Sequence, residues 1–123
     1  MTVFAQGITL AASFDAPLLK RVGAAIGLEA RAVRNEFEAT KQLANRTATP
    51  SGLACFSPQI NIVRDPRWGR AQETYGECPF LTAQLGYSYV RGMQGDHPQF
   101  VQTIASPKHF DACAMPPVPA ACG

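Results

Sequence analysis

One long amphipathic stretch constrains this sequence more than any other feature. Between Asp15 and Phe37, apolar side chains recur at intervals of three and four residues, and charged side chains fall mainly between them. This spacing is that of an α-helix that buries one face. Asp15 can accept a hydrogen bond from the first turn, and Pro17 suits that turn because its N–H would have no partner there. The pattern predicts a helix of about five to six turns, which needs a surface to cover its apolar face.

Shorter apolar segments surround this helix. A second helix is predicted from Pro79 to about Met93, with Gly95 as its stop. Three apolar runs are predicted to be strands: Gly7 to Ser13, Leu53 to Val63 with an interruption near Pro58, and Phe100 to Ser106. Strands separated by helical crossovers pair in parallel, which implies an α/β fold. Three strands cannot close a barrel, and an open sheet of this size leaves both edges bare.

The remaining segments are predicted to be irregular. Glu38 to Gly52 is polar and is predicted to be a surface loop, in which Asn45-Arg46-Thr47 is a glycosylation sequon if the parent protein is secreted. Arg64 to Glu77 is a charged loop, and Cys113 to Gly123 is a proline-rich tail that we expect to be disordered.

Composition excludes several classes of protein. The chain has 123 residues, 46% hydrophobic and 16% charged, which suits one folded domain or a piece of one. The net charge of +2 is too small to indicate a nucleic-acid partner. The apolar runs are too short for a membrane span, and no signal peptide is visible, although the parent protein is expected to be secreted.

The cysteines do not indicate a metal site. Cys55, Cys78, Cys113 and Cys122 are widely spaced, with no pair at the separation that zinc sites use. We expect them to be mostly buried free thiols, and we expect no metal and no cofactor.

Two polar segments follow predicted strands directly, and they are the candidate functional site. One runs from Arg64 to Arg70, with Glu73 and Glu77 behind it, and the other is Lys108-His109. In parallel α/β folds the loops after the strands bind ligands, so both segments should lie at one end of the sheet. Their side chains are mostly hydrogen-bond donors, which suit a sugar hydroxyl array or a carboxylate.

Plainer interpretations stand beside the functional ones. Asp65 and Arg67 more often hold such a loop in shape through an ion pair, and Trp68 more often packs than stacks on a sugar. Glu73 and Glu77 are four residues apart, but a catalytic carboxylate pair depends on a separation that sequence does not show. Neither glutamate is therefore predicted to be catalytic.

The residues SPQINIVRDPRWGRAQETYGECPFLTAQLGYSYVRGMQG, followed by SPKHF, resemble the N-terminal domain of glycoside hydrolase family 3, of the β-xylosidase and β-glucosidase type. The match covers about residues 2–112, and residues 113–123 diverge. It implies a (β/α)₈ barrel, of which this chain would supply about three parallel strands and two helices. It also implies that Arg70, Lys108 and His109 bind hydroxyls of the sugar at the point of cleavage.

Departures from the family pattern bear on activity. The family's nucleophilic aspartate and its acid/base glutamate lie downstream of KHF, and a sugar-binding aspartate lies upstream of the first predicted strand. Cys78 stands where the family has the aspartate of GEDP, and Cys55 replaces an aromatic residue.

The resemblance implies a fragment of a retaining β-glycosidase that acts on terminal, non-reducing β-xylose or β-glucose in the breakdown of plant cell-wall polysaccharides. On this interpretation the chain carries part of the sugar subsite and no catalytic residue. Two alternatives stay open: a non-catalytic carbohydrate-binding fragment, and a truncation product without function.

Overall fold

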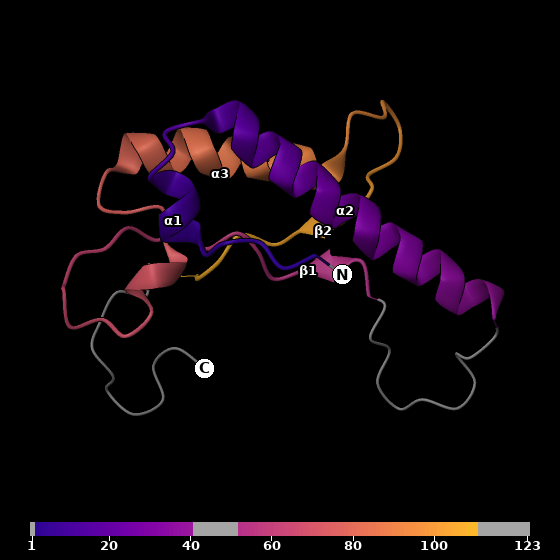
Figure 1. Ribbon diagram of the computed structural model, residues 1–123, viewed down its shortest axis with the longest axis horizontal. Helices are drawn as coiled ribbons and strands as arrows, with labels where there is room; N and C mark the ends of the chain where they lie inside the picture. The colour runs from indigo at the N-terminus through magenta and orange to yellow at the C-terminus, as the bar shows by residue number, and fades with distance from the viewer. Residues whose placement is uncertain (1, 41–51, 111–123) are drawn as a thin grey trace.

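The computed structural model describes residues 2–40 and 52–110. Its elements in chain order are helix α1 (Gly7–Ala11), helix α2 (Ala16–Ala39), strand β1 (Ala54–Cys55), the 3₁₀ turn η2 (Ala71–Glu73), helix α3 (Pro79–Gln94) and strand β2 (Ile104–Ala105). Helices α2 and α3 lie side by side over the two strands, and α1 lies beside η2 (Figure 1). The predicted sequon and the predicted disordered tail fall outside the described residues.

Both predicted helices are confirmed. The Asp15 side chain caps α2 by accepting the Leu18 N–H at 2.8 Å, as the sequence pattern indicated. Helix α3 starts at Pro79, and its cap is the Cys78 sulfur, which accepts the Leu81 N–H at 3.5 Å. Gly95 ends α3 with a φ of 76°, a left-handed conformation that glycine adopts without steric cost.

The two strands pair in parallel, as predicted, but the regular strands are much shorter than the apolar runs. Ala54 pairs with Ile104, and Cys55 pairs with Ala105. Pairing resumes beyond Pro58, where the Lys108 N–H donates to the Pro58 carbonyl (3.0 Å). The Ile60 N–H then donates to the carbonyl of Lys108 at 2.8 Å. These bonds bring the two segments after the strands together.

The prediction of a first strand at Gly7 to Ser13 is wrong, because the structure forms helix α1 there. A short apolar run has the same pattern in a buried helix as in a buried strand. Here α1 packs against η2, and Ala11 is buried in the core. The described sheet therefore has two strands and not three.

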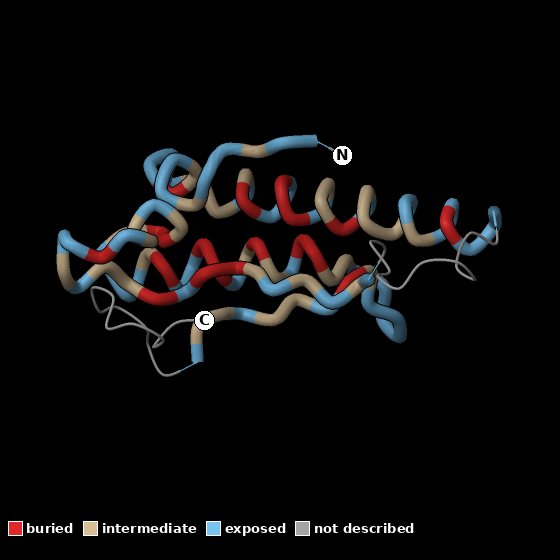
Figure 2. The backbone as a smooth tube through the Cα atoms, turned by 90° about the horizontal axis from the view of Figure 1, so that it is seen from below, coloured by how far each residue is buried: buried red, intermediate tan, exposed pale blue. Residues whose placement is uncertain are grey.

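One apolar core joins the helices to the sheet. Its buried members are Ala11, Leu19, Val22, Tyr75, Leu85, Tyr89 and Met93. Cys55 and Ala105 of the strands pack against it, so the helices cover one face of the sheet. Figure 2 shows the buried positions gathered where the helices and strands face one another. Complete burial of a side chain such as Leu19 or Leu85 contributes about 1.5–3 kcal/mol.

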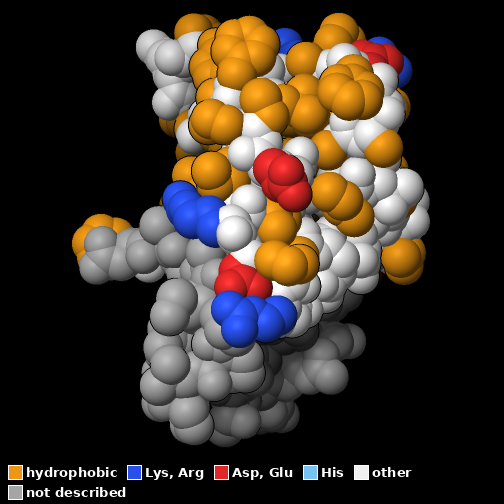
Figure 3. Space-filling model, turned by 90° about the vertical axis from the view of Figure 1, so that its left-hand side faces the viewer, with side chains coloured by type: hydrophobic (Ala, Val, Ile, Leu, Met, Phe, Trp, Pro, Cys, Tyr) orange, Lys and Arg blue, Asp and Glu red, His pale blue; other side chains and the backbone are white. Residues whose placement is uncertain are grey.

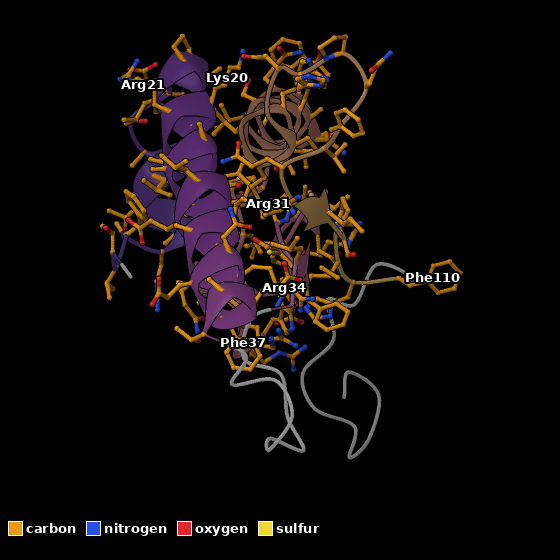
Figure 4. The ribbon with its side chains drawn as sticks, turned by 90° about the vertical axis from the view of Figure 1, so that its right-hand side faces the viewer. Lys20, Arg21, Arg31, Arg34, Phe37 and Phe110 are labelled. Carbon is orange, nitrogen blue, oxygen red and sulfur yellow. The ribbon has the colours of Figure 1, made fainter. Side chains whose placement is uncertain are left out.

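Arg31 connects α2 to the segment that precedes β2. Its guanidinium donates to the carbonyl of Gln102 at 2.7 and 3.1 Å and to that of Val101 at 3.0 Å. In Figure 4, Arg31 lies on the side of α2 that faces the strand. These bonds hold the entry to β2 against the helix, so the position of the segment after β2 depends on α2.

Three side chains differ from their predicted burial. Phe80, on the apolar stripe expected for α3, is 73% exposed, because a helix turns about 100° per residue and Phe80 lies on the side opposite to the buried Leu85 and Met93. Cys55 and Cys78 are free thiols, as expected, but Cys55 is only half-buried and Cys78 is exposed, so the expectation of burial is wrong for Cys78. Cys113 and Cys122 lie outside the described residues.

The face of the sheet opposite the helices has no cover within the described part of the chain. Phe56 is 80% exposed and Ile104 is 55% exposed. Side chains alternate between the two faces of a strand, so these two residues point away from the core that holds Cys55 and Ala105. Among the described helices, none has the length and apolar character required to cross a membrane.

Candidate functional site

The loop after β1 is held in shape by its own residues. The Asp65 carboxylate accepts hydrogen bonds from the backbone N–H (2.8 Å), Nε (3.0 Å) and Nη2 (2.6 Å) of Arg67. These bonds lower the pKa of Asp65 to about 2, chiefly through the side-chain bond. Trp68 is 4% exposed, so it packs in the interior. Both structural interpretations made from the sequence are confirmed.

Arg70 and Glu73 form a two-point ion pair at the end of this loop. Arg70 Nε lies 2.6 Å from Glu73 Oε1, and Arg70 Nη2 lies 2.9 Å from Glu73 Oε2. The turn η2 brings them together, because residues three apart face the same side of a helical turn. The arginine lowers the pKa of Glu73, and Lys108 and His109 add smaller contributions in the same direction.

Lys108 and His109 follow β2 and lie at the same end of the sheet as Arg70 and Glu73. Lys108 Nζ lies 3.6 Å from Glu73 Oε2, an ion pair too long for a hydrogen bond. The backbone N–H of His109 donates to Asn61 Oδ1 at 2.8 Å, and the peptide bond between Lys108 and His109 is cis. Arg70 and Lys108 therefore meet at Glu73, and His109, next to Lys108, is held by Asn61.

The surroundings of His109 lower the pKa of its ring, which favours the neutral imidazole near pH 7. Burial lowers its pKa first, and the charges of Arg70 and Lys108 lower it further, against the opposing influence of Glu73. Its Nε2 atom is buried and has no hydrogen-bond partner among the described residues. A neutral imidazole can both donate and accept a hydrogen bond. Such a ring suits a hydroxyl, which can also do both.

A cavity of about 380 Å³ lies at these residues. Its polar lining comes from Asn61, Arg64, Lys108 and His109. Arg70 is not among the lining residues, and it reaches Lys108 through their shared partner Glu73. At the edge of this cavity Phe110 is 95% exposed and points away from the body of the molecule (Figure 4).

A second cavity, of about 490 Å³, runs along α3 and is mainly apolar. Its lining residues include Ile60, Ile62, Ala83, Tyr87, Val90 and Pro107. Figure 3 looks at the end of the molecule where α1 and the start of α3 lie. Hydrophobic side chains gather on part of that face, and acidic and basic side chains lie next to each other below them.

Sequence reasoning missed Asn61 as a residue of the polar site, and it named Glu73 without its contacts. Asn61 holds the backbone of His109, and Glu73 joins Arg70 to Lys108. The three-residue spacing from Arg70 to Glu73 was a usable signal for their ion pair. No pattern in the sequence indicated that Lys108 would meet Glu73, because that contact depends on the parallel pairing. No three histidine, cysteine, aspartate or glutamate side chains of residues 2–40 and 52–110 gather as a metal site would require.

Two parallel strands with helices packed on one face define an α/β protein, and the donors that follow the strands form its candidate ligand site. The chain belongs to glycoside hydrolase family 3. The model of the glycosyl hydrolase family 3 N-terminal domain matches residues 1–115.

Relatives and solved structures agree with this membership. A probable β-D-xylosidase 7 of Arabidopsis thaliana is 42% identical over 112 residues, covering 91% of this chain and 13% of the relative. A probable exo-1,4-β-xylosidase of Aspergillus clavatus is 44% identical over 115 residues, covering 93% and 13%. The chain thus spans about 13% of the length of these curated relatives.

Two solved enzymes share the fold. A family 3 exo-β-xylosidase in complex with a xylobiose aziridine probe superimposes with a TM-score of 0.73 at 34% identity. A β-glucosidase from Listeria innocua superimposes with a TM-score of 0.67 at 35% identity. Each match covers 89% of this chain and 13% of the solved chain.

Proposed function

We propose that this chain supplies part of the sugar-binding subsite of a retaining β-glycosidase that cleaves terminal, non-reducing β-xylose or β-glucose. Arg70, Lys108 and His109 bind hydroxyls of that sugar. The observation that carries the proposal is the meeting of Arg70 and Lys108, from the segments after two parallel strands, at the carboxylate of Glu73, with His109 beside Lys108 in the cavity lining.

The chemistry of the cluster supports a neutral, hydroxyl-rich ligand. Arg70 uses two of its five N–H groups on Glu73 and keeps three for a ligand. Lys108 keeps its ammonium donors, because its contact with Glu73 is an ion pair without a hydrogen bond. His109 adds a group that can also accept. Hydrogen bonds that strengthen in the transition state would lower the barrier to cleavage.

The catalytic carboxylates are proposed to come from other segments of the enzyme. Glu73 is a poor candidate for a proton donor, because Arg70 holds its carboxylate ionised. By family resemblance both the nucleophile and the acid/base follow the segment that holds Lys108 and His109. The function needs no metal or cofactor, because two carboxyl groups suffice for a retaining mechanism.

Residues 2–112 are proposed to be part of a (β/α)₈ barrel, with residues 113–123 as a divergent tail. The exposed side chains of Phe56 and Ile104 support this, since in a closed barrel the face opposite the helices is a packed interior. The names of the relatives, xylosidases and glucosidases, support the substrate class and leave both sugars in the proposal.

The test is a titration of the 123-residue chain with xylose and with glucose, followed by NMR. Signals of the segment after β2 are expected to shift on addition of at least one of the two sugars. Arg70→Ala and Lys108→Ala should each weaken binding about tenfold or more, as loss of a charged donor does. Arg67→Ala is the matched control, because Arg67 is committed to Asp65. Binding that survives both site variants would refute the assignment.

A further inference from the structure

We propose that Glu73 is a positioning residue of this site, which holds Arg70 and Lys108 in the orientations that a sugar requires. The inference rests on the proposed function for its ligand. Its basis in the structure is a contact between two loops that come from different strands.

The geometry around Glu73 is that of a shared anchor. Its two carboxylate oxygens each accept from Arg70, at 2.6 and 2.9 Å, which fixes the plane of the guanidinium. Oε2 also lies 3.6 Å from Lys108 Nζ. All three side chains are about one-third exposed, at 33% for Arg70 and 30% for Glu73 and Lys108. At this exposure a ligand can reach the three side chains, and partial burial lowers the local dielectric constant, which strengthens the interactions between their charges.

The backbone of Glu73 packs against helix α1. A Cβ built on Gly7 of α1 would collide with the carbonyl oxygen of Glu73 and would lie 3.1 Å from that of Thr74. Only glycine lets α1 approach η2 this closely. The carboxylate therefore extends from a turn that is packed against a helix, so its position does not depend on the ligand.

The ionisation state of Glu73 distinguishes a positioning role from a role in proton transfer. Arg70 lowers the pKa of Glu73 and keeps the carboxylate ionised near pH 7. Glu73 in turn raises the pKa of His109, against the larger lowering by burial and by Arg70 and Lys108. Removal of the carboxylate charge should thus free Arg70 and lower the pKa of His109 further.

The experiment uses the 123-residue chain and the variants Glu73→Gln, Glu73→Asp and Glu77→Gln. Glutamine preserves the shape of the side chain and removes its charge. Aspartate keeps the charge, but its side chain is one methylene shorter, so the carboxylate lies farther from Arg70 and Lys108. Glu77 is exposed and makes no ion pair with any described residue, so Glu77→Gln is the matched control. The measurements are the Arg70 Nε–H signal, the pKa of His109 by NMR, and xylose affinity.

Glu73→Gln should broaden or remove the Arg70 Nε–H signal, lower the pKa of His109 and weaken xylose binding about tenfold or more. Glu73→Asp should weaken the Arg70 signal and leave the pKa of His109 closer to that of the parent chain. Glu77→Gln should change none of the three. Should Glu73→Gln fail to fold, the aspartate variant still tests the anchoring contact, because an unchanged Arg70 signal there would overturn it.

Two outcomes would overturn the inference: a Glu73→Gln chain with an unchanged Arg70 signal and His109 pKa, or a Glu77→Gln chain that reproduces its effects. A parent chain that binds neither xylose nor glucose would refute the proposed function. The two ligand-free measurements would still decide the role of Glu73 in that case.

Discussion

Gly92 of α3 lies directly against the backbone of Lys20 in α2. A Cβ on Gly92 would collide with the carbonyl oxygen of Lys20 and would lie 2.8 Å from the amide nitrogen of Ala24. Gly27 of α2 makes the reciprocal approach, since a Cβ there would lie 2.7 Å from the carbonyl oxygen of Met93. The two long helices are thus in contact through their backbones.

This contact predicts that Gly92→Ala destabilises the chain. Alanine favours a helix over glycine by about 1 kcal/mol, but here its methyl group would force two backbones apart, at a cost of about 1–3 kcal/mol or more. The free energy of unfolding in urea should fall. Gly69→Ala is the control, because a Cβ there would meet nothing within 4 Å. Equal stability of the two variants would contradict the packing.

The cap of α3 predicts a stabilising substitution. Cys78 offers only a sulfur acceptor, 3.5 Å from the Leu81 N–H. Cys78→Asp would supply a carboxylate at the positive end of the helix dipole and should raise the free energy of unfolding by about 1 kcal/mol. Cys78→Ala, which removes the acceptor without replacing it, should not stabilise the chain. If alanine matches aspartate, the gain does not come from capping.

The loop after β1 predicts an acid transition. The pKa of Asp65 is lowered to about 2, chiefly by its side-chain hydrogen bond with Arg67. A carboxyl group whose pKa falls on folding stabilises the fold above its unfolded pKa, and that contribution is lost as the pH falls through the folded value. The loop contact should therefore persist at pH 4 and be lost near pH 2.

Carboxyl NMR of Asp65 measures this directly. Arg67→Ala should return the pKa of Asp65 toward its ordinary value of 3.8. Arg64→Ala removes an exposed arginine of the same loop that makes no ion pair with residues in the described ranges, and it should leave the pKa unchanged. A low pKa that persists without Arg67 would assign the shift to another partner.

The 123-residue chain by itself should not hydrolyse aryl β-xylosides or β-glucosides above background. A retaining mechanism needs one carboxylate nucleophile and one carboxyl group that carries a proton. Glu73 is held ionised by Arg70, and Asp65 is engaged by Arg67. A chromogenic β-xyloside assay checks this, and turnover that Glu73→Gln abolishes would show instead that Glu73 reacts with the substrate.

Local features of the sequence predicted the helices well. The three- and four-residue apolar spacing, the Asp15 cap and the Gly95 stop all act within a few residues, so the pattern is enough to place α2 and α3. The parallel direction of the strands followed from the helical crossover between them. The ion pair of Asp65 with Arg67 was also local, over two residues.

Short segments were harder to predict. Gly7 to Ser13 has an apolar pattern that suits a strand or a buried helix, and its packing against η2 selects the helix. Phe80 was expected on the apolar stripe of α3, but it lies on the opposite side of the helix from Leu85 and Met93 and is exposed. An apolar residue near the end of a helix can therefore be assigned to the wrong face when only the residue type is considered.

The sequence by itself determined the two long helices, the parallel pairing of the two strands and the residue types of the polar site, because propensity, capping and spacing act between near neighbours. Only the tertiary structure decided that Glu73 stands between Arg70 and Lys108, that Asn61 holds His109, and that α1 is a helix. Helix α1 packs against η2, and the contacts of Glu73 with Lys108 and of Asn61 with His109 join residues far apart in the chain. They form because parallel pairing and helix packing bring their backbones together, and no local pattern records that meeting.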